Sequence, residues 1–363
     1  MPTDWLQGSM RWHRAMARLA AAHLLALATV AICSCGASKP VNQGPSPLVL
    51  EKAIPLPDTK GRIDHLAYDP AGRRLFVAEL GNDTVDTIDL ASGARTIRLS
   101  GLQHPQGLAW LDEPSELAVA DQGGTIRFYK GEKLEPVATL KVGDDADNLR
   151  VDPRNGFLIV GYGDGALATI DPTTHTVVKQ ILLPAHPEGF RLDGDAIWVN
   201  LPDNGSIVRG DLRTGAVTAH WSTGLRRLNF PMAFDAGSRT LAVAYRLPAR
   251  LVLLDPTNGS ERQALDTCGD SDDLFFDSTA QWLSVICGSG EIDVYRRGPS
   301  GFTLNASIPT RPGARTGLFV AQENRLYVAA REQGARSAAV LVFRLDDKNP
   351  RADAVSTGRA PGS

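Results

Sequence analysis

The sequence predicts an all-β fold, a seven-bladed β-propeller with four strands per blade. One observation is that two segments 82 residues apart read almost alike, QHPQGLAW at 103–110 and AHPEGFRL at 185–192. The other is that one order of short apolar runs and Gly-, Asp- and Asn-rich turns recurs seven times. Four short strands in a period of about 42 residues are typical of a propeller blade.

One apolar residue in each copy defines the period, and we place it in the first strand of each blade. These anchors are Leu66, Leu108, Leu149, Phe190, Met232, Leu274 and Leu318. The intervals between them are 41 to 44 residues, and the two similar segments belong to the second and fourth copies. Their separation is therefore two periods of the repeat.

Each copy repeats the same order of strand and turn signals. The first strand leads into a turn such as DPAGRR at 69–74, and an alternating strand such as LFVA at 75–78 follows. A third strand such as TVDTIDL at 84–90 precedes a tight turn such as ASG at 91–93, and a fourth strand comes next. Short β-branched runs between such turns favour strands over helices.

The last copy lacks a fourth strand, because its third strand, AAVLVFRL at 338–345, is its final one. An unassigned strand, LVLEKAIPLP at 48–57, lies before the first copy. We therefore predict that this N-terminal strand closes the ring as the outermost strand of the last blade, an arrangement that protects sheet edges. The propeller then spans residues 48–346.

The N-terminal segment predicts export. Arg11, Arg14 and Arg18 precede an apolar run at 19–32, which is the pattern of a secretory signal, although a retained membrane anchor is the alternative. We assign 1–35 to the signal peptide, 36–47 to a flexible tether and 347–363 to a disordered C-terminal tail. No later stretch is long and apolar enough to cross a bilayer.

The signal ends in ICSC at 32–35, which resembles the lipobox of bacterial lipoproteins. The resemblance implies that Cys35 is lipid-modified and anchors the chain to a membrane. Gly36, in place of Asp, then implies an outer-membrane lipoprotein facing the periplasm. A soluble periplasmic or secreted protein is the alternative.

Charge and cysteine usage narrow the partners. The net charge of −3 and a pI near 6.2 argue against nucleic acid, which needs a basic surface. Cys268 and Cys287 fall on the same face of the sixth copy, so we predict a disulfide between them. We expect a monomer that binds an envelope protein or a small ligand.

The loops that enter the first strands and the gaps after the second strands should share one face around the central channel, because successive strands are antiparallel. Functional residues are often presented by such loops on a rigid frame. The candidate ligand-binding residues there are Asp64, His65, His104, Gln106, Asp147, Asn148, Glu188, Asn229, Tyr245, Arg246, Asp272, Arg315 and Arg331.

Four of these candidates are carboxylates at equivalent positions, namely Asp64, Asp147, Glu188 and Asp272. Acids around a narrow mouth must protonate, meet cations or bind a metal. Such oxygen-rich clusters suit Ca²⁺ or Mg²⁺. The alternative is that these carboxylates cap turns. The histidines of HPQG and HPEG are interpreted as loop-packing residues.

The first copy, GRIDHLAYDPAGRRLFVAELGNDTVDTIDLASG at 61–93, resembles the YVTN/NHL group of bacterial propellers, and the resemblance covers about residues 48–345. It implies the fold and little about function. PQGLAW at 105–110 is similar to a stretch of gluconolactonase-like propellers, which implies a divalent-metal-dependent lactone hydrolase. DHLAY at 64–68 departs from that family's first-blade motif.

No G-x-S-x-G, P-loop, HExxH or CxxC motif occurs in the sequence. A binding protein that holds its ligand at the loop face is therefore the leading hypothesis, and the lactone hydrolase is the alternative.

Overall fold

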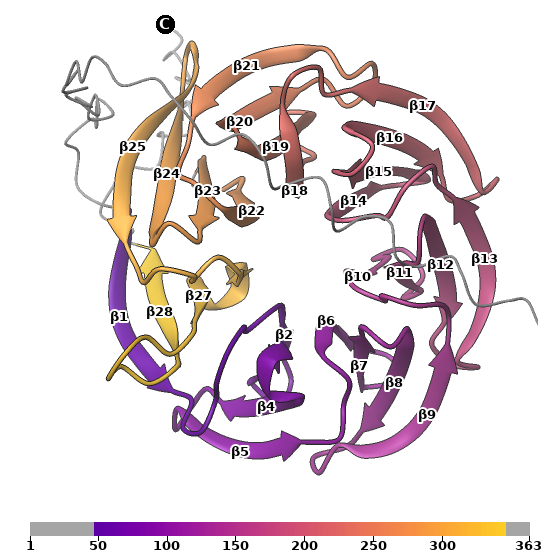
Figure 1. The fold of residues 1–363 in the computed structure, drawn as a ribbon, viewed down its shortest axis with the longest axis vertical. Helices are drawn as coiled ribbons and strands as arrows, with labels where there is room; N and C mark the ends of the chain where they lie inside the picture. Colours follow the sequence, from indigo (N-terminus) through magenta and orange to yellow (C-terminus); the bar gives the residue numbers. More distant parts are fainter. Residues whose placement is uncertain (1–46, 280, 346–363) are drawn as a thin grey trace, which may run out of the picture. The chain divides into compact units, whose positions relative to one another are not determined.

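The computed structural model describes residues 47–279 and 281–345, and it confirms the predicted seven-bladed propeller. Within these residues, seven antiparallel sheets of four strands each surround a common axis (Figure 1). Strands that follow one another within a blade pair antiparallel. In the first blade, for example, Leu66 of the first strand lies opposite Val77 of the second.

The first three blades follow the chain in order. The first comprises β2 (Leu66–Asp69), β3 (Arg74–Glu79), β4 (Thr84–Asp89) and β5 (Ala94–Leu99), with the 3-10 helix η1 (Leu80–Asn82) after β3. The second comprises β6 (Pro105–Leu111), β7 (Glu116–Asp121), β8 (Thr125–Lys130) and β9 (Glu135–Lys141). The third comprises β10 (Leu149–Val151), β11 (Leu158–Tyr162), β12 (Ala166–Asp171) and β13 (Thr176–Leu182).

The next three blades repeat this order. The fourth comprises β14 (Phe190–Asp193), β15 (Ala196–Leu201), β16 (Ser206–Asp211) and β17 (Ala216–Ser222). The fifth comprises β18 (Arg227–Asp235), β19 (Thr240–Leu247), β20 (Ala249–Leu254) and β21 (Glu261–Asp266). The sixth comprises β22 (Ser271–Asp277), β23 (Trp282–Cys287), β24 (Glu291–Gly298) and β25 (Gly301–Pro309).

The seventh blade joins the two ends of the propeller. It contains β26 (Gly317–Val320), the 3-10 helix η2 (Ala321–Glu323), β27 (Arg325–Ala330), β28 (Ala339–Leu345) and β1 (Leu48–Pro55). The outermost strand β1 pairs antiparallel with β28, from Leu48 opposite Leu345 to Pro55 opposite Ala339. The predicted closure by the N-terminal strand is confirmed.

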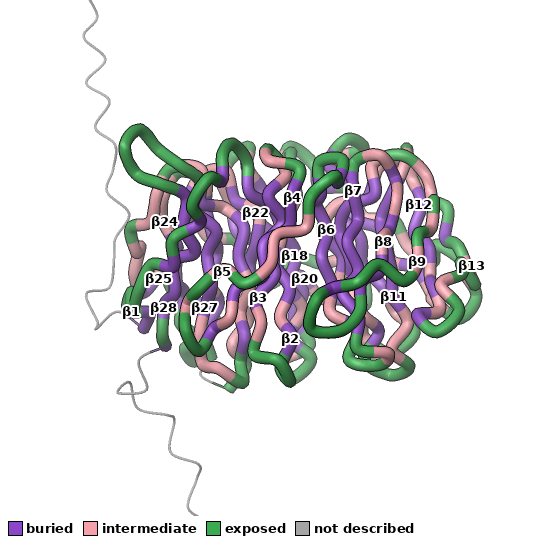
Figure 2. The backbone as a smooth tube through the Cα atoms, turned by 90° about the horizontal axis from the view of Figure 1, so that it is seen from below, coloured by how far each residue is buried: buried purple, intermediate pink, exposed green. Residues whose placement is uncertain are grey.

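The core lies between neighbouring blades. For example, Ala118 and Ile126 of the second blade pack in one cluster with Leu158 and Val160 of the third. The second strands are therefore covered on both faces, and β7 and β11 are buried along their whole length. We expected buried and exposed residues to alternate along the second strands, and this prediction was wrong because both faces are covered. The buried segments lie in the strands, between two layers of exposed turns (Figure 2).

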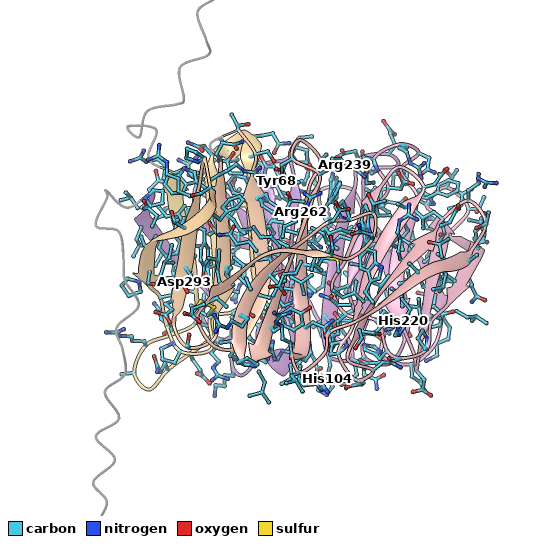
Figure 3. The ribbon with its side chains drawn as sticks, turned by 90° about the horizontal axis from the view of Figure 1, so that it is seen from above. Tyr68, His104, His220, Arg239, Arg262 and Asp293 are labelled. Atoms are coloured by element: carbon cyan, nitrogen blue, oxygen red, sulfur yellow. A yellow bond between two sulfur atoms is a disulfide. The ribbon has the colours of Figure 1, made fainter. Side chains whose placement is uncertain are left out.

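The two faces of the propeller carry different turns. His104, just before β6, lies at the rim opposite the one that carries Tyr68 of β2 and Arg239, which precedes β19 (Figure 3). The face of His104 therefore presents the loops that enter the first strands. We call it the mouth face.

Cys268 and Cys287 form a disulfide with a Cα–Cα distance of 5.8 Å, which confirms the predicted pairing. Disulfides are typical of oxidising compartments, and the bond indicates an extracytoplasmic location. The predictions for 1–35 (including lipidation of Cys35), for the tether at 36–47 up to Ser46 and for the tail at 347–363 lie outside the described residues. None of the helices in the described part has the length and hydropathy of a membrane span.

Candidate functional site at the channel mouth

A cavity of about 570 Å³ opens on the mouth face, and we call it the bowl. Its lining comes from the loops before the first strands and from the turns after the second strands, as the antiparallel strand order predicts. The lining residues are Arg62, Gln106, Gln122, Asp144, Asp145, Asp147, Gly163, Asp164, His186, Glu188, Asp203, Phe230, Arg246, Asp272 and Arg315.

The glycines of the HPQG and HPEG segments explain why the chain repeats them. A Cβ on Gly107 would lie 2.0 Å from the backbone oxygen of Asp147, and one on Gly189 would lie 2.4 Å from that of Phe230. A side chain at either position would separate the entry loop of one blade from that of the next. These two glycines therefore permit adjacent loops to meet at the mouth.

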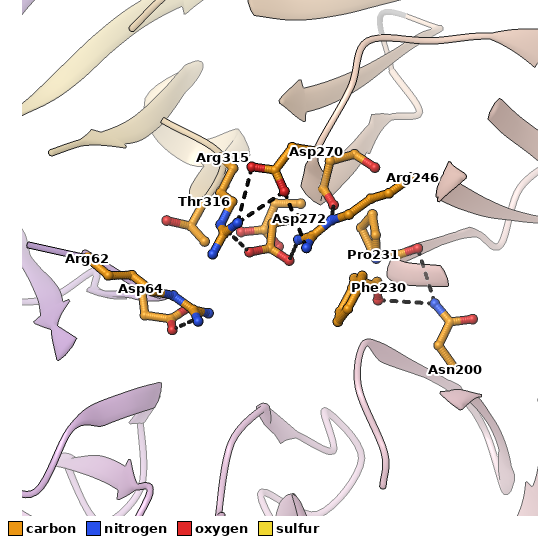
Figure 4. Close-up of polar contacts among 12 residues, drawn as sticks. Arg62, Asp64, Asn200, Phe230, Pro231, Arg246, Asp270, Asp272, Arg315 and Thr316 are labelled. Carbon is orange, nitrogen blue, oxygen red and sulfur yellow. Dashed lines mark hydrogen bonds and ion pairs between the residues drawn. The ribbon is translucent and has the colours of Figure 1, made fainter. Parts of the chain in front are cut away.

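On the side of the fifth to seventh blades, arginines compensate the acids (Figure 4). Asp272 lies 2.6 Å from Arg246 Nη2 and 2.9 Å from Arg315 Nε. Arg246 also stacks on the ring of Phe230, with its Cζ 3.9 Å from the ring centroid. Burial raises the pKa of Asp272, and the two arginines oppose that shift.

Asp64 is the first-blade member of this compensated group. Its carboxylate lies 2.8 Å from Arg62 Nη2, as Figure 4 also shows. Partial burial of the Arg62 guanidinium acts to lower its pKa. Asp64, Asp272 and other mouth acids act in the opposite direction and are stronger together, so the pKa of Arg62 is raised. Asp64 and Asp272 therefore each have a permanent positive partner.

Asp147 and Glu188, on the side of the third and fourth blades, have no such partner. Neither forms an ion pair with an arginine or lysine among the described residues, and Asp147 has only His65 at 3.9 Å. Burial and the neighbouring Asp64 carboxylate raise the pKa of Asp147 to about 6. Burial and the carboxylates of Asp147 and Asp272 raise the pKa of Glu188 well above its usual value.

His65 lies at the centre of these acids. Its Nδ1 is 3.6 Å from Asp273 and its Nε2 is 3.9 Å from both Asp64 and Asp147. Burial disfavours the imidazolium, but the surrounding carboxylates outweigh it and raise the pKa of His65 to about 10. The imidazolium supplies one positive charge to the narrower cavity that adjoins the bowl.

His186 is a bowl residue with one ring nitrogen bound to the backbone. Its Nδ1 lies 2.7 Å from the backbone oxygen of Gly163. A carbonyl oxygen only accepts hydrogen bonds, so Nδ1 donates to it and Nε2 is the ring nitrogen left for other partners. The donor atoms of Asp147, His186 and Glu188 all lie within 4.8 Å of one another.

Below the bowl, the channel narrows and carries two arginines. Arg150 and Arg191 line a small cavity with Asn148, which accepts a hydrogen bond from Arg150 Nη2 at 3.2 Å. Burial and the charge of Arg150 lower the pKa of Arg191 to about 9, and burial lowers the pKa of Arg150. The mouth is therefore mainly acidic. The narrower cavity beneath it carries both charges, because its lining includes Arg150, Arg191 and His65 together with Glu188, Asp272 and Asp273.

Seven predicted ligand-binding residues do not line the bowl. Asp64 lies beside it, paired with Arg62, and His65 and Asn148 line the small cavity below. The other four lie elsewhere. Asn229 is fully buried and donates to Asn200 and to the backbone of Ser206. Tyr245 belongs to the buried core between the fourth and fifth blades. The other two are exposed: His104 pairs with Asp83 at 3.0 Å, and Arg331 lies beside Gly313.

Sequence reasoning missed several residues of the bowl and channel. Asp145 accepts a hydrogen bond from Gln106 and lies 3.9 Å from His186 Nε2. Arg62 lies two residues before the predicted Asp64, so a wider window around each anchor would have found it. His186, two residues before Glu188, was interpreted as a loop-packing residue and not as a ligand. Arg150, one residue after an anchor, was not among the predicted residues.

No family model matches this sequence, and no curated protein is significantly similar to it. Solved structures do share its fold. One is a chain of the "Crystal Structure of Mitotic Checkpoint Complex", with a TM-score of 0.70 and 17% identity over 92% of this chain and 100% of that chain. Another is the hydrazine synthase of Kuenenia stuttgartiensis, with a TM-score of 0.68 and 15% identity over 80% of this chain and 97% of that one.

At such identities the likeness shows the fold alone. The protein is a seven-bladed β-propeller, a class that commonly serves as a binding scaffold, and unrelated functions share this fold. The resemblances to the YVTN/NHL group and to gluconolactonase-like propellers gain no family assignment from these comparisons.

Proposed function

We propose that this propeller is a binding protein whose bowl takes a positively charged ligand, such as a small organic cation or the basic group of a partner. The observation that carries the proposal is the imbalance of charge around the bowl. Seven carboxylates and three guanidiniums line it. All three guanidiniums are already paired with acids, so the excess charge is negative.

The position of that excess supports the same conclusion. Asp144, Asp145, Asp164 and Asp203 lie on the side of the second to fourth blades, next to Asp147 and Glu188. The walls of a cavity of this size exclude part of the solvent, which strengthens the attraction of an entering cation. Burial and repulsion by neighbouring carboxylates raise the pKa of Glu188, and a cationic ligand would relieve the repulsion.

The test is a binding assay with the purified protein in a chelator-treated buffer. We expect spermidine to bind and to raise the melting temperature, whereas citrate should do neither. The variant Asp164→Asn/Asp203→Asn, which removes two exposed bowl carboxylates, should weaken spermidine binding about threefold or more.

The matched control is Glu132→Gln/Glu135→Gln, which removes two exposed carboxylates on the opposite face, one in the turn before β9 and one at the start of β9. This control should bind spermidine as the wild type does. Equal affinity of the two double variants, or tighter binding of citrate than of spermidine, would contradict the proposal.

A metal-dependent lactone hydrolase is the second candidate. The observation that favours it is the raised pKa of Asp147 and Glu188, because perturbed carboxyl groups cluster at catalytic sites. This candidate predicts turnover of a lactone panel when divalent ions are added, with loss of turnover in Glu188→Gln. Absence of turnover would rule out this candidate, and binding would be the only function still proposed.

A further inference from the structure

We propose that Asp147, His186 and Glu188 form a binding site for one divalent transition-metal ion. The inference rests on the proposed function, because it names the first cation that the bowl would hold. The three residues each offer one donor atom, and these atoms lie within 4.8 Å of one another. Two donors bound to one ion at about 2.1 Å lie at most about 4.2 Å apart, so a small contraction completes the site.

Rigid parts of two neighbouring blades position the three donors. Asp147 precedes β10, and its backbone N–H donates to the carbonyl of Gly161 at 3.0 Å. His186 and Glu188 flank Pro187 before β14, and the N–H of Glu188 donates to Asn200 at 3.0 Å. Gly161 lies directly against the ring of Pro187, where a Cβ would approach to 2.9 Å. The site is therefore held by backbone contacts, before any ion binds.

The imidazole of His186 has the arrangement that metal-binding histidines show. A ligating histidine usually donates its other ring N–H to a carbonyl or carboxylate, which orients the ring and increases its basicity. Here Gly163 accepts from Nδ1, which leaves Nε2 for an ion, and Nε2 lies 3.9 Å from the carboxylate of Asp145. Loop packing alone would not require Nε2 to lie near a carboxylate.

Asp147 supplies an independent observation. The residue is only 9% exposed, yet its buried Oδ1 has no hydrogen-bond partner in the described structure. A buried carboxylate oxygen without a hydrogen bond is costly, and a metal ion directly satisfies it. The only ion-pair contact of this oxygen is the distant one to His65 at 3.9 Å.

The donor set indicates the kind of ion. One imidazole nitrogen with two carboxylates suits Zn²⁺ or Mn²⁺, whereas Ca²⁺ and Mg²⁺ prefer oxygen donors alone. Asp145, partly exposed and 3.9 Å from His186 Nε2, is placed to add a fourth donor. This set retains two of the four predicted metal ligands, Asp147 and Glu188. Asp64 and Asp272 are instead paired with arginines.

The other cluster of potential ligands among the described residues does not compete. Cys268, Glu291 and Asp293 also lie close together. Cys268 is bonded to Cys287, however, and a disulfide sulfur offers no thiolate to a metal.

The experiment is calorimetric titration of the full chain, without a histidine tag and stripped with a chelator, with Zn²⁺, Mn²⁺ and Ca²⁺. We expect a saturable isotherm with one site for Zn²⁺, and binding of Ca²⁺ at least about tenfold weaker. The variants His186→Ala and Glu188→Gln should each weaken Zn²⁺ binding about tenfold or more, which is the size of effect that even indirect ligand support has.

The matched control is His104→Ala, because His104 occupies the same place in the HPQG segment and lies beside a single acid, Asp83. It should leave the isotherm unchanged. Co²⁺ provides a second readout, since its visible spectrum should change when His186 is removed and not when His104 is removed. Circular dichroism verifies that each variant is folded.

The outcomes separate this inference from the proposed function. Spermidine binding without a saturable Zn²⁺ isotherm would overturn the metal site and leave the cation-binding function intact. Zn²⁺ binding that survives His186→Ala and Glu188→Gln would place the ion elsewhere and also overturn the inference. If neither Zn²⁺ nor spermidine binds, both proposals are wrong.

Discussion

Glu79 is a buried carboxyl group at the end of β3, outside the bowl. It accepts hydrogen bonds from Thr59 at 2.6 Å and Thr84 at 2.5 Å, and it lies 3.1 Å from Arg98 Nη2. Burial nevertheless raises its pKa to about 7, with a further contribution from the nearby Asp86, while the two threonines oppose the shift. The residue therefore changes charge close to neutral pH.

This raised pKa predicts a stability that depends on pH. Between the unfolded value near 4.5 and the folded value near 7, the folded state binds more protons than the unfolded state. The contribution of Glu79 to the free energy of unfolding therefore falls as pH rises through that window, by about 1–3 kcal/mol. Urea denaturation of Glu79→Gln between pH 5 and 8 should give a correspondingly flatter curve.

The control for this prediction is Glu135→Gln, because Glu135 is exposed at the start of β9. Its pH profile should follow that of the wild type. Parallel profiles for Glu79→Gln and the wild type would show that Glu79 titrates normally in the folded protein.

The four mouth carboxylates show where residue-level prediction ends. Their equivalent positions in the repeat placed all four at the mouth, and Asp147, Glu188 and Asp272 do line the bowl, with Asp64 beside it and paired to Arg62. The repeat could not tell which acids have arginine partners. Asp64 has its partner two residues away, but the partners of Asp272 come from other blades, since Arg246 and Arg315 lie 26 and 43 residues away.

At the scale of single elements, the closing strand β1 connects the N-terminal end of the propeller to its last blade. Ile54 of β1 pairs with Val340 of β28 and packs in the cluster that also contains Val77 and Ile88 of the first blade. This strand therefore contacts both sides of the junction between the last and first blades.

Truncation of Ile54 should weaken that junction. Ile54 is 2% exposed, so Ile54→Ala leaves a cavity and should lower the free energy of unfolding by about 2–4 kcal/mol. Val49, on the same strand, is 41% exposed, and Val49→Ala should cost less than about 1 kcal/mol. Urea denaturation monitored by tryptophan fluorescence measures both. Similar losses would mean that β1 does not take part in the cooperative core.

The strands themselves were largely predictable from the sequence, because turn residues and β-branched runs recur with a constant period. The prediction of which strand residues are buried was wrong for the second strands. The second strands were expected to alternate, whereas β7 is buried throughout, because a propeller blade packs against a neighbour on each face. Alternation survives in outermost strands such as β17, whose residues alternate between exposed and partly buried over its second half.

At the scale of the whole molecule, the ring turns scattered loop residues into one polarised site. Acids dominate the bowl on the side of the second to fourth blades, and arginines pair with acids on the side of the fifth to seventh. Deeper in the channel, Arg150 and Arg191 add positive charge beside Glu188, Asp272 and Asp273. A ligand that enters the mouth thus meets a negative region first.

This arrangement predicts that binding of a cation depends on salt. Spermidine affinity should fall as ionic strength rises from about 0.05 to 0.5 M, because the exposed carboxylates Asp164 and Asp203 are screened. The decrease should be smaller in Asp164→Asn/Asp203→Asn. Calorimetry at three salt concentrations measures it, and an affinity that does not change with salt would show that the bowl binds through apolar contacts.

The sequence by itself determined the propeller, its seven blades, the closing strand, the disulfide and the face on which candidate residues gather. Each of these follows from local signals repeated at a constant period, or from the antiparallel order of strands within one blade. The tertiary structure alone decided which acids are compensated, that a ring nitrogen of His186 lies near the uncompensated ones, and that Tyr245 and Asn229 belong to the interior. Those properties depend on distances between blades, and side chains 26 to 45 residues apart make these contacts without any fixed spacing in the repeat.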